Sequence, residues 1–538
     1  AGAGSLTDVL QRMPGAEVVQ NGGPGATSGV FLRGANAAQT LVLIDGMRVA
    51  SASSGATALE AIPLDQIERI EILRGPASSL YGADAIGGVI QIFTRGGGAG
   101  PHANASFGYG TYETSSASAG ISGGSAVAQG SLELSQRHSD GFNATTPANP
   151  LYDPDRDGYR NGSVNARGQL NPGSGQSLSL QYYRSRLDNQ FDGGDHYNDR
   201  TITTDTLWKA LWSSRFASWW RSRLSVGEGG DDSVSKTGYG DFPFQTRQRQ
   251  YAWQSDFTLP SANAHPAGTF TLALERLEEN VATEPAFPVD ERDTNSATGI
   301  YRLVAGANAV QANLRYDDSN QFGGKTTGTV AWGYRLSPMW RVTASAGTGF
   351  RPPTFNDLYY PDYSNPSLQP ETSHNVELGI RAAGRVGEVA WHAQAVGYDN
   401  RVRDLVVFQC DANGNCQPNN VADATLRGVT LTGDLGWNES TLRASVDLQS
   451  PTDDASGNLL PRRARRHASV SFSQPFGALR LVAECVVSSA RFDDAANTRR
   501  MGGYGVVNLA AEWPLSHGVT LFARADNLFD KNYELAAD

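Results

Sequence analysis

One stretch of the sequence has residue types and spacing that could bind a metal ion. Asp153, Asp155 and Asp157 stand at every second position, and a glycine follows directly. Alternate carboxylates in this D-x-D-x-D-G pattern turn toward one point, and the glycine permits the sharp bend that opens a calcium loop. An EF-hand would need a bidentate glutamate at position twelve, where this chain has Val164. The pattern therefore predicts a calcium loop of another type or, alternatively, a solvated acidic loop.

The three cysteines indicate an exported protein. Cys410 and Cys416 bracket a short, turn-rich tip. This spacing favours a disulfide that pins an exposed loop in an oxidising compartment, although two free thiols would also fit. Cys485 lies in an apolar run and is predicted to be a small packed side chain.

No catalytic motif accompanies these residues. The sequence has no G-x-S-x-G, H-E-x-x-H, Walker A or C-x-x-C pattern, and its eight histidines are scattered without metal-ligand spacing. The net charge is −11, from 44 Lys and Arg against 55 Asp and Glu. An acidic chain argues against nucleic acid as a partner, because phosphates require a basic face. We therefore expect no enzymatic activity and no nucleic-acid binding.

The elements that must position these residues alternate in polarity with a period of two. Between residues 442 and 448, and again between 519 and 525, every second side chain is apolar. Short turns such as 514–518 alternate with long polar stretches such as 139–162 and 188–205. This asymmetry is the layout of an outer-membrane β-barrel, with short turns at one end and long loops at the other.

A soluble β-sandwich would show the same alternation, so length decides between the two folds. Residues 99–538 form one alternating run, which is too long for a single sandwich. At roughly 20 residues for each strand and its connection, the run gives about 22 strands, within the range of membrane barrels. We predict an all-β membrane protein whose residues 99–538 form a 22-stranded antiparallel transmembrane β-barrel.

The first 98 residues have a different character. Ser5 is a candidate N-cap of a short helix, and the apolar run 41–44 predicts a strand buried on both faces. Further strands are expected at 67–73 and 89–93. Residues 1–98 therefore predict a small α+β domain, and its size suits the plugged lumen of a wide barrel. A plugged barrel is not a diffusion pore, because something must move the plug.

Sequence blocks along the chain resemble the TonB-dependent outer-membrane transporters. They span nearly the whole chain in the family's order, and within the family the chain is most similar to the cobalamin branch. The matching blocks are residues 36–46, 67–76, 79–90, 349–354, 365–371 and 526–533, and those shared with the cobalamin branch are 12–15, 20–23, 31–36 and 315–323. The family's N-terminal energy-coupling box and its last strand are expected to lie outside this chain, because a barrel without its last strand would leave unpaired edges in lipid.

The resemblance implies two sets of site residues. Both acidic stretches would hold calcium, and bound calcium would order the loops around the ligand. The implied calcium residues are Asn143, Asp153, Asp155, Asp157, Asp192 and Asp199. The residues implied to contact the corrin ring and its amides are Thr27, Gly29, Asn36, Ser54 and Gly55 of the plug and Arg462 of the barrel. Similar plug loops also occur in siderophore transporters, and paired arginines often line the barrel wall.

The charged residues of the plug suggest how it is held. We predict that Arg33, Arg69 and Arg74 form a cluster against the barrel wall together with Glu68 and Glu71. A wet, charged interface can be displaced more easily than an apolar one.

The function that the resemblance implies is energy-coupled uptake of cobalamin across the bacterial outer membrane. The protein would be a monomer in outer-membrane lipid, driven by the TonB energy-transducing complex of the inner membrane. A ferric-siderophore transporter of the same family is the alternative. A non-transporting surface receptor barrel is less favoured, because it needs no plug. Haem is disfavoured, because no histidine stands between Phe350 and Leu368, where haem transporters of the family carry one.

Overall fold

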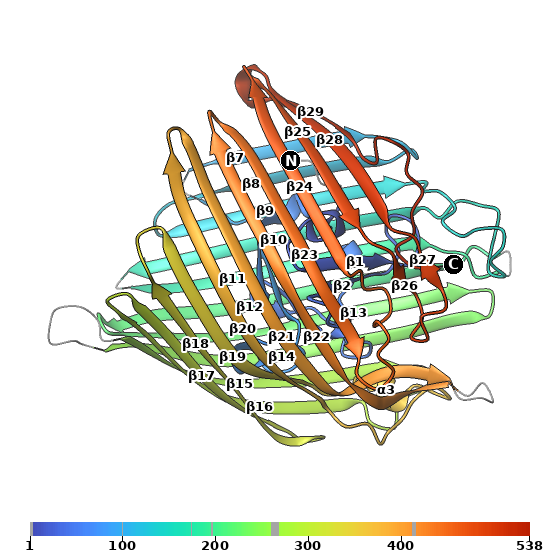
Figure 1. Ribbon diagram of the computed structural model, residues 1–538, viewed down its shortest axis with the longest axis horizontal. Helices are drawn as coiled ribbons and strands as arrows, with labels where there is room; N and C mark the ends of the chain where they lie inside the picture. Colours follow the sequence, from blue (N-terminus) through green and yellow to red (C-terminus); the bar gives the residue numbers. More distant parts are fainter. Residues whose placement is uncertain are drawn as a thin grey trace.

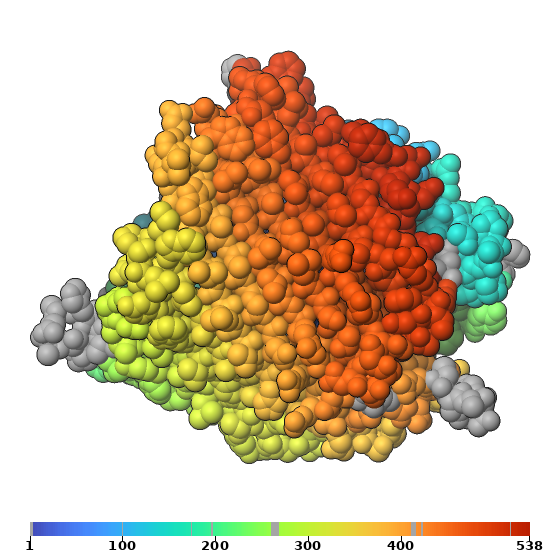
Figure 2. Space-filling view, in the orientation of Figure 1, coloured from blue at the N-terminus to red at the C-terminus, as the bar shows by residue number. Residues whose placement is uncertain are grey.

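The computed structural model of the protein describes residues 4–98, 100–173, 175–194, 197–259, 268–410 and 416–537. An N-terminal domain, which we call the plug, lies inside a β-barrel formed by the rest of the chain (Figure 1). The space-filling view shows that the later strands, coloured yellow to red, hide the blue plug from this side (Figure 2). No helix in these residues is long and apolar enough to cross a membrane.

The plug contains short helices and two small sheets. Its helical elements are α1 (Leu6–Gln11), η1 (Ala37–Gln39), η2 (Leu59–Ala61), η3 (Leu64–Gln66) and α2 (Ser78–Tyr81). Its strands are β1 (Ala16–Gln20), β2 (Ser28–Leu32), β3 (Thr40–Ile44), β4 (Met47–Arg48), β5 (Ile67–Arg74) and β6 (Gly88–Thr94). Strands β1 and β2 form a hairpin, and the order β4-β3-β6-β5 forms a mixed sheet in which β3 and β6 are parallel.

Local sequence signals explain the start and the centre of the plug. The Ser5 side chain accepts a hydrogen bond from the Asp8 backbone N–H at 3.1 Å, and the Asp8 carboxylate accepts one from the Ser5 backbone N–H at 3.0 Å, which closes a capping box. Every residue of β3 is buried, as its continuous apolar run predicts. The predicted helix and the three predicted strands are therefore confirmed.

Twenty-one antiparallel strands of the described chain form one closed barrel. They are β7 (His102–Tyr109), β8 (Ser115–Gly124), β9 (Ala128–Ser139), β10 (Tyr159–Gly173), β11 (Gln176–Gln190), β12 (Arg200–Ala217), β13 (Trp220–Thr237), β14 (Gly240–Leu259), β15 (Gly268–Thr283), β16 (Glu291–Ala305), β17 (Asn308–Ser319), β18 (Gly323–Arg335), β19 (Trp340–Arg351), β20 (Glu371–Val386), β21 (Val389–Cys410), β22 (Cys416–Trp437), β23 (Ser440–Asp453), β24 (Arg466–Phe476), β25 (Leu479–Ser488), β28 (Tyr504–Pro514) and β29 (Thr520–Ala525). The twenty-second strand, expected outside this chain, stays a prediction.

The barrel exposes apolar side chains and buries polar ones. Along β11, Leu178, Leu180 and Tyr182 are exposed, whereas Ser185, on the opposite face, is fully buried. A soluble sandwich would show the reverse, so this alternation fits an outer face in lipid and an inner face against the plug. The predicted plug–barrel boundary, between residues 98 and 99, falls in the connection between β6 and β7.

The two ends of the barrel differ as the sequence predicts. Connections such as 306–307, 387–388 and 438–439 are two residues long and define what we call the turn end. Long connections such as 140–158 and 454–465 define the loop end. The short elements outside the barrel sheet are α3 (Phe355–Tyr359), β26 (Arg491–Phe492) and β27 (Arg500–Met501), which lie in loop-end connections, and η4 (Ser516–Gly518) in a turn.

The long hairpin of β21 and β22 carries the predicted disulfide. Cys416 is disulfide-bonded, and its backbone is paired with that of Cys410. The side chain of Cys410 and residues 411–415 lie outside the described part of the chain. Cys485 is a free, half-buried cysteine on β25, as predicted.

The prediction that the plug charges form one cluster against the barrel wall is wrong. The Arg33 Nη1 lies 2.6 Å from the Glu377 Oε1 on β20, and Arg74 is half-buried nearby, where desolvation and the charge of Arg33 lower its pKa to about 10. Arg69, in contrast, is exposed and pairs with Glu71, its neighbour two positions along β5. Because β5 is an edge strand of the plug sheet, its outward charges pair with each other rather than with the wall.

Candidate ligand and cation sites at the loop end

Three of the implied ligand residues gather around η1. A Cβ atom added to Gly29 would lie 3.1 Å from the Cβ of Ala37. Gly55 has a φ of 72°, and a Cβ added there would lie 3.0 Å from the Cβ of Ala38. Asn36 is the N-cap residue of the same helix. Because the two glycines let their loops approach η1 this closely, the fold brings Gly29, Asn36 and Gly55 to one surface.

The other two implied plug residues lie at the exposed ends of these loops. Thr27 closes the β1–β2 hairpin, since its carbonyl accepts a hydrogen bond from the Asn21 backbone N–H at 3.0 Å. The Ser54 Oγ accepts from the Ala56 N–H at 3.3 Å. Both side chains are exposed and therefore accessible to a ligand. We call the set Thr27, Gly29, Asn36, Ser54 and Gly55 the plug apex.

Arg462 lies beside the plug apex in the connection between β23 and β24. Its Nε is 2.6 Å from the Asp493 Oδ1, and its Nη1 donates to the Asn21 Oδ1 at 2.8 Å. Arg462 therefore links a loop of the barrel to the turn of the β1–β2 hairpin, which also contains Thr27. A ligand at this position would share or displace these contacts.

The next residue, Arg463, is a contact that the sequence analysis missed. Its guanidinium lies 4.0 Å from the centre of the Phe31 ring and donates to the Asn36 side chain. Its Nε also donates to the Gly34 carbonyl at 3.2 Å. Arg463 is buried, so it positions Asn36 while Arg462 stays partly accessible. The paired arginines were visible in the sequence, but nothing in it told which of them faces the plug.

A row of aromatic rings borders the plug apex on the other side and was also missed. The Phe355 N–H of α3 donates to the Ala52 carbonyl of the plug at 3.4 Å, which joins α3 to the loop that carries Ser54 and Gly55. The ring pairs Phe244–Tyr360, Tyr360–Tyr363 and Tyr363–Phe408 have centres 6.1, 6.4 and 6.4 Å apart. The aromatic residues that follow the block at 349–354 in the sequence could have indicated this row of rings.

The two acidic stretches converge on a group of three carboxylates. Asp155, Asp157 and Asp192 each offer one carboxylate oxygen, and these three oxygens lie within 4.8 Å of one another. Burial and the charges of Asp192 and Asp155 raise the pKa of Asp157 to about 6, and burial also raises the pKa of Asp192. Both oxygens of Asp192 are buried and make no hydrogen bond of normal geometry among the described residues, although the Asp153 backbone and the Thr145 side chain lie close to them. Carboxylates held this close repel one another unless protons or a cation neutralise them.

The remaining residues of the implied calcium set surround this group. The Asn143 side chain donates to the Asp153 backbone carbonyl and accepts from the Thr145 N–H, so it stabilises the loop itself. Asp199 is almost fully buried and accepts from the Gly238 N–H at 3.2 Å. The structure thus brings Asp155, Asp157 and Asp192 together and places Asn143, Asp153 and Asp199 in the framework around them.

The chemistry of this donor set suits calcium. The donors are carboxylate oxygens, which hard cations such as Ca²⁺ prefer over the nitrogen and sulfur ligands of transition metals. The unpartnered Asp192 oxygens and the raised pKa of Asp157 are the features that a bound cation would relieve. The residues therefore fit a calcium ion.

Sequence comparisons identify relatives along almost the whole chain. Residues 1–89 match the profile of the TonB-dependent Receptor Plug Domain, and residues 95–528 match that of the TonB dependent receptor-like β-barrel. The chain is 30% identical to the vitamin B12 transporter BtuB of Photobacterium profundum over 99% of its own length and 87% of the relative's. It is 29% identical to the BtuB protein of Vibrio vulnificus, over 98% and 86% of the two chains.

Solved structures share the fold. The siderophore receptor PirA of Acinetobacter baumannii superposes with a TM-score of 0.83 at 17% identity, covering 98% of this chain and 92% of PirA. The copper transporter OprC gives a TM-score of 0.83 at 16% identity, covering 99% and 91%. The ferric enterobactin receptor PfeA of Pseudomonas aeruginosa gives 0.81 at 18%, covering 98% and 90%. At these identities the likeness shows the architecture, a plug inside a barrel.

Proposed function

This chain belongs to the TonB-dependent receptors, β-barrel proteins of the bacterial outer membrane, and from that premise we propose that it takes up cobalamin with energy from the TonB complex. The observation that carries the proposal is the full-length similarity to proteins named vitamin B12 transporters, at 30% and 29% identity. In this proposal the loop end of the barrel faces the outside of the cell. The protein works as a monomer in outer-membrane lipid.

The plug apex has the chemistry that a large, amide-rich ligand requires. Gly29 and Gly55 leave backbone groups open to close approach, because neither carries a side chain. Asn36, Thr27 and Ser54 supply hydrogen-bonding groups around them. Arg462 adds a cationic donor from the barrel, so ligand contacts would come from both parts of the molecule.

Calcium would prepare the loops before the ligand arrives. We assign Asp155, Asp157 and Asp192 as its carboxylate ligands, with Asn143, Asp153 and Asp199 holding the loops that present them. The ion would neutralise the group and fix the two acidic stretches relative to each other. Ordering these loops in advance lowers the conformational entropy that ligand binding must otherwise remove.

Transport in this account requires movement of the plug and no covalent chemistry. The ligand binds at the loop end, and the TonB complex then displaces the plug by pulling on a segment N-terminal to it. Buried charge pairs such as Arg33–Glu377 resist that displacement until force is applied. The protein makes and breaks no covalent bond in the ligand, so it is a transporter and not an enzyme.

A ferric siderophore is the second candidate ligand. The row of aromatic rings beside the plug apex, from Phe244 to Phe408, favours it, because such rings stack on planar aromatic groups. Among the structural neighbours, PirA is named a siderophore receptor and PfeA a ferric enterobactin receptor, but their identity to this chain is below 20%.

Calorimetry of the purified protein distinguishes the candidates. Cyanocobalamin is titrated into the detergent-solubilised protein with Ca²⁺ and again with a chelator. We expect saturable binding with Ca²⁺ and weaker binding with the chelator. Absence of binding at micromolar cyanocobalamin in both conditions would remove cobalamin as the ligand. The same titration with a ferric catecholate siderophore tests the alternative.

A further inference from the structure

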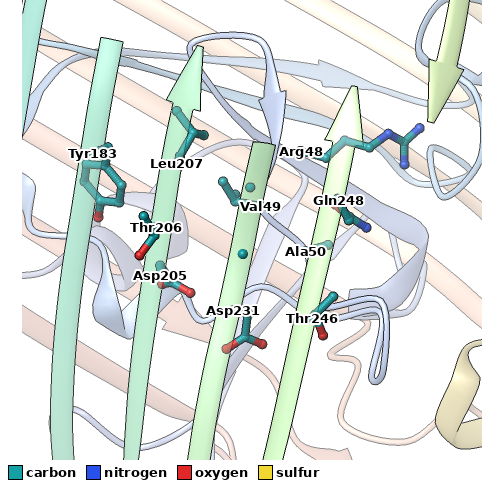
Figure 3. A pocket seen from close by; sticks show the side chains of 12 residues that line it. Arg48, Val49, Ala50, Tyr183, Asp205, Thr206, Leu207, Asp231, Thr246 and Gln248 are labelled. Carbon is teal, nitrogen blue, oxygen red and sulfur yellow. The ribbon is translucent and has the colours of Figure 1, made fainter. Parts of the chain in front are cut away.

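A separate cavity lies between the side of the plug and the barrel wall. It is enclosed by the plug segment from Arg48 to Ala50 and by strands β11 to β14 (Figure 3). The space open to the centre of a water-sized group is about 10 Å³, which suits a single water molecule or a small ion. We call it the interface cavity. None of the plug-apex residues and none of the acidic-loop residues lines it.

Two carboxylates of the wall face this cavity from neighbouring strands. Asp205 on β12 and Asp231 on β13 are directly opposed in the sheet register. The Cβ atoms of such a pair lie about 4.5–5.5 Å apart, so the two carboxylates are close neighbours. Asp205 is only 9% exposed, and the Asp231 Oδ1 is buried without a hydrogen-bond partner in the described chain. Glu60 of the plug lies nearby and adds a third acidic group.

The arginine side chains of this region form ion pairs with carboxylates other than Asp205 and Asp231. Arg48 lines the cavity, but its guanidinium points away (Figure 3) and binds Asp84 at 3.0 Å. Arg247 forms a two-pronged pair with Asp232, at 2.6 and 2.9 Å. Across the ranges that the structure describes, neither Asp205 nor Asp231 forms an ion pair. Two adjacent carboxylates buried without a counter-charge are strongly disfavoured, so something else must neutralise them.

An orphaned hydroxyl group independently indicates an occupant. Tyr183 on β11 lines the same cavity and is 1% exposed. Among the described residues its buried Oη makes no hydrogen bond of normal geometry, although the Ser185 hydroxyl on the same strand lies close to it. A buried tyrosine hydroxyl normally finds a partner. Thr246 on β14 adds a further hydroxyl group to the lining. The polar groups that turn toward the cavity are therefore oxygen donors.

We propose that the interface cavity binds one hard divalent cation, of the Ca²⁺ or Mg²⁺ type, between the plug and the barrel wall. Asp205 and Asp231 balance its two charges, and the Tyr183 Oη is the third protein ligand. Oxygen donors are those that such cations prefer. The Ser51 hydroxyl of the plug lies 3.3 Å from the Thr246 hydroxyl, which lines the cavity on β14, so the ion stabilises a contact between the plug and the wall. This site is independent of cobalamin and of the calcium loops.

Counting bound ions tests the proposal. Equilibrium dialysis with radioactive Ca²⁺ is applied to the wild-type protein, the cavity variant Asp205→Asn/Asp231→Asn, the loop variant Asp155→Asn/Asp157→Asn, and the four-fold combination. We expect the cavity variant to bind one ion fewer than the wild type. The four-fold variant should likewise bind one ion fewer than the loop variant. Equal counts within both pairs would overturn the proposal and leave a shared proton as the neutralising species.

A milder variant covers the case in which the cavity variant does not fold. Tyr183→Phe removes one ligand oxygen and keeps the ring that packs against the plug core. In the loop-variant background it should weaken Ca²⁺ binding at least about fivefold, and Mg²⁺ should compete for the site. Unchanged Ca²⁺ affinity in Tyr183→Phe would also overturn the proposal.

Discussion

The plug meets the barrel wall in two different ways. Toward β19–β24, which we call the paired side, buried charges have partners: Arg33 binds Glu377 at 2.6 Å, and Gln39 donates at 2.9 Å to Glu371. Toward β11–β14, the cavity side, Asp205 and Asp231 line the small interface cavity. There, burial also raises the pKa of Glu60 to about 7.

The difference indicates which contacts anchor the plug and which contacts loosen more easily. Removing one partner of a buried ion pair leaves an uncompensated charge, so the paired side should yield only under force. On the cavity side Ser185 of β11 and Lys209 of β12 hydrogen-bond carbonyl groups of the plug, but Asp205 and Asp231 have no ion-pair partner among the described residues. That contact should therefore loosen when the cation that we propose for the cavity leaves. We expect the plug to separate from the wall first along β11–β14.

The largest effect is expected on the paired side. Arg33→Ala leaves the half-buried Glu377 without its cationic partner, while the Asn375 amide still donates to it, and should lower the free energy of plug opening by about 3–5 kcal/mol. Hydrogen exchange of the β2 and β3 amides measures this opening. A loss below about 1 kcal/mol would mean that the pair does not anchor the plug, and the contrast between the two sides would fail.

A steric variant probes the cavity side. A Cβ atom at Gly229 of β13 would lie 2.8 Å from the Arg48 carbonyl oxygen, a backbone atom that cannot turn away. Gly229→Ala should therefore push the plug from the wall and lower the free energy of plug opening by about 1–3 kcal/mol. Gly168→Ala is the matched control, because a Cβ there meets nothing within 4 Å. Equal exchange rates in the two variants would show that the plug does not rest on this strand.

The acidic loops should affect ligand binding and leave both sides of the plug interface unchanged. Asp155→Asn/Asp157→Asn should weaken cyanocobalamin binding about tenfold, or ~1.4 kcal/mol, and abolish its dependence on Ca²⁺. Calorimetry measures the affinity, and hydrogen exchange of the plug should match the wild type. Asp241→Asn, at the start of β14, is the control, because its carboxylate pairs with Lys236 and not with the acidic loops. Binding that stays calcium-dependent in the double variant would show that the cation binds elsewhere.

The smallest effect is expected for a plug charge that has no partner on the wall. Arg69 and Glu71 are more than half exposed, and surface pairs of this kind contribute about 0–1 kcal/mol. Arg69→Ala should therefore leave plug opening almost unchanged, in contrast to Arg33→Ala. Equal losses in the two arginine variants would contradict the assignment of the paired side.

Local patterns made much of the fold predictable. The apolar run of β3 and the Ser5 cap act over a few residues, so the sequence alone predicts them. The alternation at 442–448 on β23 likewise predicts which side chains face inward, since Ser445 and Asp447 are buried and Val446 and Leu448 are exposed. These signals depend on neighbours in the sequence, and the structure confirms them.

Contacts between distant segments were not predictable in this way. Asp205 and Asp231 become a pair only through the register of β12 and β13, and the cavity beside them exists only because the plug docks there. Which of Arg462 and Arg463 is buried against the plug and which stays accessible to a ligand similarly depends on the path of the β23–β24 connection over the plug apex. The acidic pattern at 153–157 predicted a cluster, but its third member, Asp192, comes from a different loop.

Uptake by living cells tests the central claim most directly. The full-length protein is produced in a bacterium that lacks its own outer-membrane cobalamin transporter, and accumulation of radiolabelled cyanocobalamin is measured with and without a functional TonB complex. The account predicts accumulation that requires both this protein and TonB. No accumulation, despite folded protein in the outer membrane, would contradict it.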